Sequence, residues 1–444
     1  MTYPTTQTKI VEVFKTVLFK EENFLKLLST GDFQGFEMNL LASFQKIYDY
    51  TVSFLVNKVS AREAFKKTMR EYGRSKGVKK LSIRKNSLQI ATGTYISFPG
   101  YYAEQVSADY RGERSMSHVY WGSIEKASPV YVSRSTQLSV ITPSFAIAKD
   151  VMRNFDCKSQ TERNRKLCLS TGKKALLDRV KNMLFEGESL AGKRVLIGTD
   201  GGRTRTRVWK TTTDSDYGEF DTPWKEPKLL VISIIGNDGK MDKKELPIYD
   251  VCFGDDELFA LLSDYLSAME VEKATSVQFV GDGAPWIWLR AKPMLLNLGV
   301  NEANITETLD YYHALEHLND LAQYLPNDVQ DKTMKVLKDL LWQGDIPQMK
   351  TVLAQILPDL DTKPLKPFIY FEKNQHRMQY KYFEEKKLPV GSGIVESGIR
   401  RVINLRFKCP SSFWNLDNLQ PLFYLRAAFL GGRWNNLMNN LVLN

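Results

Sequence analysis

The feature that most constrains this chain is a series of apolar, strand-like runs between residues 194 and 282. Three of them, "RVLIGTD", "KLLVISII" and "LPIYDVCF", precede a helical stretch, "DDELFALLSDYLSAME", and the fourth, "SVQFVGD", follows it. Each run is short and is bounded by Gly, Asp or Pro, which is typical of buried strands. A helix at "PWIWLRAKPMLLNL", a strand at "NITETLD" and a helix from "YYHALEHL" come next. The sequence therefore predicts an α/β core.

Three strands, a helix and a fourth strand are the opening order of an RNase H-like sheet. Between residues 327 and 375, "VQDKTMKVLKDLLWQ" and "IPQMKTVLAQIL" are amphipathic, and no strand pattern separates them. We expect a multidomain α/β protein whose RNase H-like core occupies residues 191–326 and 386–444. An all-helical insertion at 327–385 would interrupt this core.

The residues before the core predict a mainly helical region. In residues 1–60 apolar positions recur at helical spacing, with a break near "STGDFQG". Residues 61–141 combine a basic segment with a small β element, in which "LQIATGTYISFPGYYA" (88–103) is expected to be a strand that ends at the Pro-Gly turn. Residues 142–190 form short helices that could be a helix-turn-helix, with an ordinary helix pair as the alternative.

Charge points to a polyanionic partner. The 444 residues carry a formal charge of +10, which suits nucleic acid, although an anionic membrane surface would also fit. Residues 61–86 hold ten Lys or Arg and two Glu, a net +8. Aromatic and aliphatic residues interleave with these charges, which favours a structured DNA contact over a solvated linker. The candidate contacts in this segment are Lys79, Lys80, Arg84 and Lys85.

The spacing of the cysteines and the lack of recognisable targeting signals favour a reducing, cytoplasmic environment. The four cysteines are widely spaced and form no C-x-x-C pair, so neither a disulfide framework nor a zinc ribbon is indicated. No signal peptide or membrane span is evident in the sequence. We expect a soluble cytoplasmic protein with no membrane partner.

Two acids follow strands that should be neighbours in the sheet. Asp200 ends the first core strand in "VLIGTDGG", and Asp282 ends the fourth in "VQFVGDG". Acids between glycines are more often turn residues than ligands. Here, however, the two carboxylates should meet at one sheet edge, and hard cations such as Mg²⁺ take such oxygen ligands.

A third carboxylate is expected from Glu396 in "GSGIVESGIRR". Gly391 and Gly393 permit a tight turn, Ser392 is a candidate N-cap, and Glu396 would lie in the first turns of the helix that follows. Arg400, one turn later, could meet the same phosphate, as could Arg401. Two Mg²⁺ or Mn²⁺ ions held by the three acids would activate a water or a 3′-hydroxyl for in-line attack on a phosphodiester.

Together, "GTDGG", "GDGAPWIW", "DYYHALEHL" and "GSGIVESGIRRVINLRFKCPSSFW" resemble bacterial insertion-sequence transposases of the DDE class, in the branch related to the ISKra group. The resemblance covers about residues 194–440. It implies that Asp200, Asp282 and Glu396 are the catalytic acids of an RNase H-like domain. A D-x-x-H motif matches Asp310 and His313, and it implies that His313 lies beside the scissile phosphate. The resemblance weakens over the first 190 residues, where relatives often carry a cysteine-rich zinc segment that this sequence lacks.

Further residues are candidates for DNA contact or for packing. In "RTRTR", a strand would place Arg203, Arg205 and Arg207 on one face, where they could track a DNA backbone, although an exposed hairpin is the alternative. Trp286 and Trp288 cannot share a helix face, so one is expected to pack in the core while Trp286 is the candidate for an unpaired base. His313 and His317 stand four residues apart, but no third soft ligand is near in sequence, so His317 is interpreted as a packing residue.

Three functions fit these patterns. The leading prediction is a DDE transposase, associated with the bacterial nucleoid, that binds terminal inverted repeats, cleaves DNA with Mg²⁺ and joins the 3′-hydroxyl to target DNA as a homodimer or larger assembly. The alternatives are an RNase H-fold nuclease without strand transfer and a domesticated DNA-binding protein with an idle active site.

Overall fold

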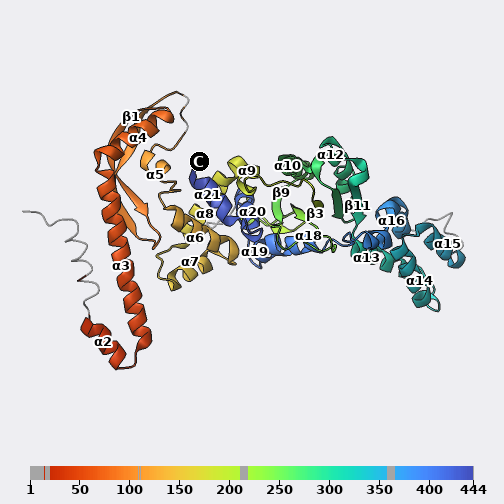
Figure 1. Ribbon diagram of the computed structural model, residues 1–444. Helices are drawn as coiled ribbons and strands as arrows, with labels where there is room; N and C mark the ends of the chain where they lie inside the picture. Colours follow the sequence, from red (N-terminus) through yellow and green to blue (C-terminus); the bar gives the residue numbers. More distant parts are fainter. Residues whose placement is uncertain are drawn as a thin grey trace, which may run out of the picture. The chain divides into compact units, whose positions relative to one another are not determined.

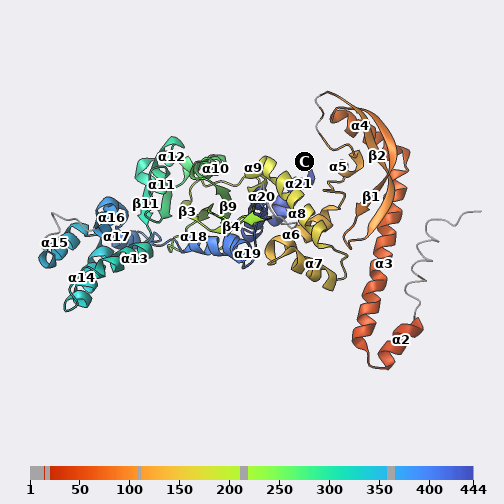
Figure 2. The same cartoon turned by 180° about the vertical axis from the view of Figure 1, so that it is seen from behind.

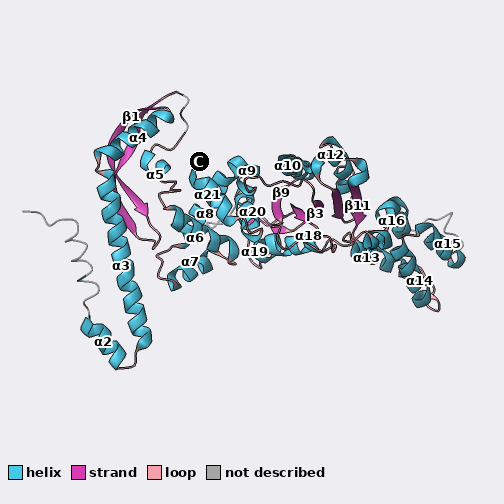
Figure 3. Ribbon diagram, viewed as in Figure 1, coloured by secondary structure: helices cyan, strands magenta, loops and turns pink. Residues whose placement is uncertain are grey.

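The computed structural model describes residues 15, 21–108, 110, 112–210, 219–357 and 366–443. It is a mixed α/β protein in which helices predominate (Figure 3). The chain forms two compact units, residues 1–174 with 438–444 and residues 175–437. The division therefore falls between Lys174 and Ala175, whereas the sequence predicted that the core begins at residue 191.

The first unit begins with two helices, as the sequence predicted for the described part of residues 1–60. α2 (Glu21–Ser29) and α3 (Phe33–Ser60) are separated at Gly31, whose φ of 78° is readily adopted by glycine. Asp32 then starts α3, because its side chain accepts a hydrogen bond from Gly35 N at 2.8 Å. The predicted residues 1–14 and 16–20 lie outside the described residues.

The basic segment is an ordered helix and strand rather than a linker. α4 (Glu63–Ser75) leads into β1 (Val78–Gln89), which pairs antiparallel with β2 (Tyr95–Val106). The expectation of a strand ending at the Pro-Gly turn is wrong, since Pro99 lies inside β2 opposite Lys85. A two-stranded sheet leaves one edge of each strand unpaired, so a residue without an N–H is tolerated there.

The other helices of the first unit follow this hairpin. They are α5 (Met116–Tyr120), α6 (Pro129–Ile141), α7 (Phe145–Asn154) and α8 (Thr161–Ala175). Ser128 and Ser144 each start a helix by accepting a backbone N–H, from Tyr131 and from Ile147. α7 and α8 occupy the predicted helix-turn-helix segment, and a role for them in reading DNA stays a prediction.

The second unit is built on a mixed five-stranded sheet. In chain order its strands are β3 (Arg194–Gly201), β8 (Pro227–Ile234), β9 (Ile248–Phe253), β10 (Ser276–Gly281) and β11 (Ile305–Leu309). They lie in the order β9, β8, β3, β10, β11, with antiparallel pairing from β9 to β3 and parallel pairing from β3 to β11. The predicted neighbours, the strands that carry Asp200 and Asp282, are thus confirmed to be adjacent.

Helices cover both faces of this sheet (Figures 1 and 2). α10 (Asp255–Ala268) and α12 (Ala291–Asn297) lie on one face, and α18 (Gly393–Gly398) lies on the other. Side chains along β10 alternate accordingly: Phe279 stacks on Phe259 of α10, while Val280 points toward the opposite face. α20 (Leu416–Leu430) packs beside β9 and is buried along most of its length.

A group of helices lies beyond the β11 edge of the sheet (Figure 1). It consists of α13 (Tyr311–Ala322), α14 (Gln330–Gln343), α15 (Ile346–Ile356), α16 (Lys366–Asn374) and α17 (Tyr380–Glu385). The described residues between 327 and 385 contain helices and connecting turns only, in agreement with the helical insertion expected there. Its apolar stripe is buried at Leu337, Leu341, Met349 and Leu353.

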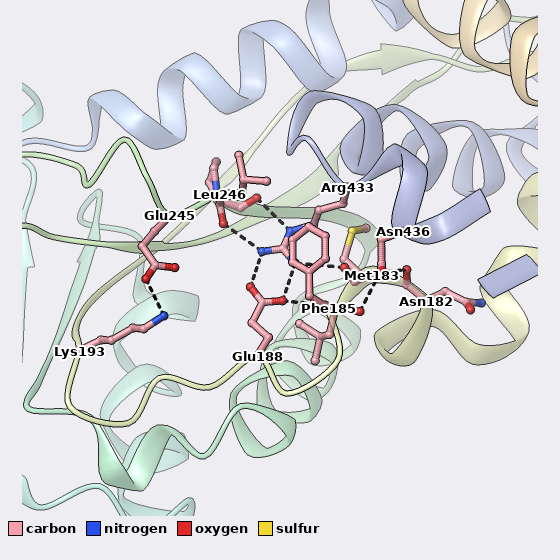
Figure 4. A network of polar contacts seen from close by, with 11 residues as sticks. Asn182, Met183, Phe185, Glu188, Lys193, Glu245, Leu246, Arg433 and Asn436 are labelled. Carbon is pink, nitrogen blue, oxygen red and sulfur yellow. Dashed lines mark hydrogen bonds and ion pairs between the residues drawn. The ribbon is translucent and has the colours of Figure 1, made fainter. Parts of the chain in front are cut away.

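A buried arginine fastens the end of the second unit to its beginning (Figure 4). Arg433 is fully buried and forms two hydrogen bonds of 2.6 Å with the carboxylate of Glu188. It also donates to Met183 O and Leu246 O, and its guanidinium lies 4.8 Å from the ring centre of Phe185. These contacts satisfy a charge that would otherwise be costly to bury.

Candidate active site

Two half-buried carboxylates lie at the same edge of the sheet. Asp200 is at the end of β3 and Asp282 directly follows β10, the parallel neighbour of β3. Burial raises the pKa of Asp200, and the negative charge of Asp282 raises it further. His313 and Lys228 act in the opposite direction on that pKa, so both are close enough to interact with Asp200. The fold thereby brings together Asp200, Asp282 and His313, which the sequence had placed in one site.

The acid of β3 lies on the sheet face that α18 covers. Asp200 comes two residues after Gly198 within β3, so these two residues lie on one face, whereas Asp282 follows β10 in a turn in which its Oδ1 accepts from Ala284 N at 2.9 Å. Gly198 lets α18 approach closely, since a Cβ there would overlap Cγ2 of Val395 and would press on Val280. Glu396 is the next residue along α18, and it is exposed.

Asp310 determines how the segment before α18 is held. It is fully buried at the end of β11, and its Oδ1 accepts hydrogen bonds from Tyr312 N at 2.7 Å and His313 N at 2.9 Å. Its other oxygen accepts from Ser392 N. One carboxylate therefore starts α13, orients the turn that carries His313 and fixes the start of α18.

Gln278 makes a second link to that segment. From β10, its Nε2 donates to Pro389 O at 2.7 Å and to Thr308 Oγ1 at 2.8 Å. Backbone bonds from Asp310 N to Gly281 O and from Tyr311 N to Val390 O complete the connection. The polypeptide before Glu396 is thus attached to the two strands that end at the candidate site.

Glu396 lies in a helix whose N-cap residue is Ser392, as expected. The Ser392 side chain makes no capping hydrogen bond, and its backbone N–H donates to the carboxylate of Asp310. The helix continues through a π-helical segment, η5 (Ile399–Asn404), into α19 (Leu405–Phe407). Arg400 and Arg401 follow on this segment and are both exposed.

Tyr370 of α16 packs over the loop that carries Asp282. No sequence pattern predicted that Tyr370 lies near this acid. A Cβ on Gly283 would overlap the Tyr370 ring, so glycine is needed there. Burial and the charges of Asp282 and Asp310 raise the pKa of Tyr370. The ring of His317 lies 3.8 Å from that of Tyr370, centre to centre, which supports the interpretation of His317 as a packing residue. The buried Tyr370 hydroxyl has no hydrogen-bond partner among the described residues.

The two tryptophans after Asp282 have different surroundings. Trp288 is buried against Phe279, and its Nε1 donates to Asp282 O at 2.7 Å, so it holds the acid's backbone in place. Trp286 is half-buried, with Phe259 at one side of its ring and Lys228 Nζ 4.2 Å from the ring centre. The expectation that one tryptophan packs in the core is confirmed for Trp288.

The three arginines of "RTRTR" share an exposed face, as predicted. Thr204 and Thr206 between them are buried, and they donate to Phe407 O and Pro223 O. Arg205 lies in β4 (Thr204–Arg205), which pairs with β7 (Trp224–Lys225). β5 (Val208–Trp209) pairs with β6 (Phe220–Asp221) further along the same hairpin. The exposed hairpin, which was the alternative for this segment, is therefore present, and it follows Asp200 in the chain.

In the first unit the predicted DNA contacts lie along β1. Lys79, Lys80, Arg84 and Lys85 are all exposed. Lys80 and Arg84 share the carboxylate of Glu104, at 3.4 and 3.6 Å, and Arg84 also lies over the Tyr102 ring. Lys79 and Lys85 form no ion pair with any described residue.

The residues at the sheet edge partly fit a divalent cation. Two carboxylates close enough to repel each other, beside a buried hydroxyl without a partner, provide the hard oxygen donors that Mg²⁺ prefers. Across the described ranges, however, no three acidic, His or Cys side chains are grouped closely enough to hold a metal ion. Glu396 therefore does not complete a triad in this arrangement, and the metal stays a prediction.

Comparisons with known proteins provide no family for this chain: no family model, no curated protein and no solved structure matches it. Among the described helices, none combines the length and the apolar character that a membrane crossing requires.

Proposed function

We propose that this chain is an RNase H-like DDE transposase that cleaves transposon ends and joins them to target DNA in a reaction that depends on Mg²⁺. The observation that carries the proposal is the pairing of Asp200 with Asp282 at the ends of adjacent parallel strands. In order along the sheet, the strands are the third, second, first, fourth and fifth, with the first three antiparallel. This order supports an RNase H-like core.

The residues of the site have distinct proposed roles. Asp200 and Asp282 would hold the cations, and Glu396 of α18 would be the third acid of the site. Bound divalent ions would activate the attacking water or 3′-hydroxyl and neutralise charge on the leaving oxygen. His313 would orient the scissile phosphate, and Arg400 and Arg401 would contact flanking phosphates.

A cleavage assay tests this function. The full-length protein is mixed with DNA that ends in the inverted repeats flanking its gene, with Mg²⁺ or with EDTA. We expect cleavage and strand transfer only with Mg²⁺, and a loss on the order of 100-fold or more for Asp282→Asn. Asp256→Asn is the matched control, because this exposed acid pairs with Arg290 on the surface.

The products separate the alternatives. Cleavage without strand transfer would indicate the nuclease, and DNA binding without cleavage would indicate the DNA-binding protein with an idle site. Activity in EDTA, or a fully active Asp282→Asn protein, would contradict the metal mechanism.

A further inference from the structure

The hairpin after Asp200 presents cations and aromatic rings on one face. Arg205 lies directly opposite Trp224, and Trp209 lies directly opposite Phe220. The guanidinium of Arg205 is 4.8 Å from the ring centre of Trp224, and that of Arg207 is 5.0 Å from Trp209. Same-face residues recur every second position in a strand, so the two groups are expected on one side of the hairpin, which we call the Arg-Trp face. It consists of Arg203, Arg205, Arg207, Trp209, Phe220 and Trp224.

The Arg-Trp face is exposed although it carries large apolar rings. Trp209 and Trp224 are 55% and 48% exposed, which is unusual for tryptophan. Within the described residues, none of the three arginines pairs with a carboxylate. The acids of the hairpin that are described, Glu219 and Asp221, instead pair with Lys210. In the described part of the chain, the three guanidinium groups are therefore free of carboxylates, and both indole rings stay about half exposed beside them.

The opposite face of the hairpin is anchored, which fixes the Arg-Trp face in place. Thr204 Oγ1 donates to Phe407 O at 2.9 Å, and the backbones of Arg205 and Arg207 exchange hydrogen bonds with Trp414. On the Arg-Trp face itself, Phe220 is half-buried and packs against Phe413. A rigid surface binds with less loss of conformational entropy than a mobile one.

We propose that the Arg-Trp face binds an unpaired DNA strand next to the candidate active site, with bases stacked on Trp209 and Trp224 and phosphates on the arginines. Exposed aromatic rings between cations are the combination that binds single strands, and charge complementarity with phosphate accounts for the arginines. A duplex keeps its bases stacked on each other, so the rings would add little to duplex binding. The proposal rests on the proposed function, since it gives that site a frayed or single-stranded substrate.

The test measures fluorescence anisotropy of a labelled 20-nucleotide single strand and of the corresponding duplex, in EDTA. We expect Trp209→Ala with Trp224→Ala to weaken single-strand binding by about tenfold or more and to change duplex binding by less than about threefold. Trp209→Phe with Trp224→Phe should retain most of the affinity, because phenylalanine still stacks. Arg205→Ala with Arg207→Ala should weaken both ligands and reduce the salt dependence.

Controls separate this inference from the proposed chemistry. Tyr382→Ala removes another exposed aromatic residue beside a lysine, outside the hairpin, and should not alter binding. Asp282→Asn should bind the single strand normally even though it does not cleave, so the two proposals can fail independently. Circular dichroism verifies the fold of each variant. Single-strand binding that is absent in the wild type, or that is unchanged in the Trp→Ala protein, would overturn the inference, as would equal losses for strand and duplex.

Discussion

At the scale of single residues, one buried carboxylate connects three segments of the candidate site. Asp310 accepts backbone hydrogen bonds from Tyr312, His313 and Ser392, and it lies directly after β11. Each bond alone is modest, but a buried N–H that loses its acceptor carries the full cost of desolvation. The geometry of His313 and of the start of α18 therefore depends on this side chain.

We expect Asp310→Asn to lower the free energy of unfolding by about 2 kcal/mol, because asparagine has one acceptor oxygen and its amide would face the Ser392 N–H. Urea unfolding followed by circular dichroism measures the change. Asp345→Asn is the control: Asp345 is an exposed N-cap that accepts from Gln348 N, and asparagine caps equally well. Equal effects in the two variants would show that Asp310 is an ordinary helix cap.

Some residues of the candidate site follow from local sequence patterns, and others depend on tertiary packing. The positions of Asp200 and Asp282, each at the end of an apolar run and beside glycine, predicted that both acids belong to the candidate site. Tyr370 could not be predicted, because it comes from the helical insertion and reaches Asp282 only through tertiary packing. Ser392 was predicted as an N-cap from its local sequence, whereas nothing local indicates that its N–H donates to Asp310, 82 residues earlier in the chain.

At the scale of elements, the position of α18 depends on a glycine in the sheet. Gly198 of β3 has no Cβ where Val395 of α18 approaches, and Gly398 faces Leu229 of β8 in the same way. The helix that carries Glu396 therefore lies closer to the strands than larger side chains would permit. Its distance from the sheet is part of the geometry of the candidate site.

Gly198→Ala is expected to destabilise the protein by about 1–3 kcal/mol, because the added methyl overlaps Val395. Val395→Ala in the same chain should restore part of this loss by removing the overlapping methyl. A double-mutant cycle measured by urea unfolding gives the coupling between the two residues. Additive effects would contradict a direct contact between them.

Periodicity predicted the elements better than their ends and contacts. The strands of the core, the helix between the third and the fourth, and the helices of the insertion follow from apolar patterns that burial dictates. The prediction that the strand ends at Pro99 and Gly100 was wrong, because proline is tolerated within a strand that has an unpaired edge. The sequence did not decide between a strand that contacts DNA and an exposed hairpin after Asp200. Strands as short as β4 and β7 have almost no periodic apolar pattern.

At the scale of the whole molecule, the second unit depends on contacts between residues far apart in sequence. Arg433 bonds to Glu188, Met183 and Leu246, so it joins the chain before β3, the chain before β9 and the C-terminal segment (Figure 4). No local pattern predicts this contact.

Arg433→Lys is expected to lower the free energy of unfolding by about 3 kcal/mol, because an ammonium group cannot make the two parallel bonds to Glu188 and also reach the carbonyls. The neighbouring pair of Lys193 and Glu245 is partly exposed, so Lys193→Ala should cost less than about 1 kcal/mol. Thermal or urea unfolding of the two variants measures the difference. Similar values would mean that the buried pair contributes no more than a surface pair.

In the proposed mechanism, Asp200 and Asp282 together hold a divalent cation. The most direct measurement is an anomalous-scattering map from crystals of the full-length protein grown with Mn²⁺ and a DNA end. We predict a peak about 2–2.5 Å from a carboxylate oxygen of each acid, absent from crystals of Asp282→Asn. A map with Mn²⁺ bound elsewhere, and no peak between Asp200 and Asp282, would contradict the claim.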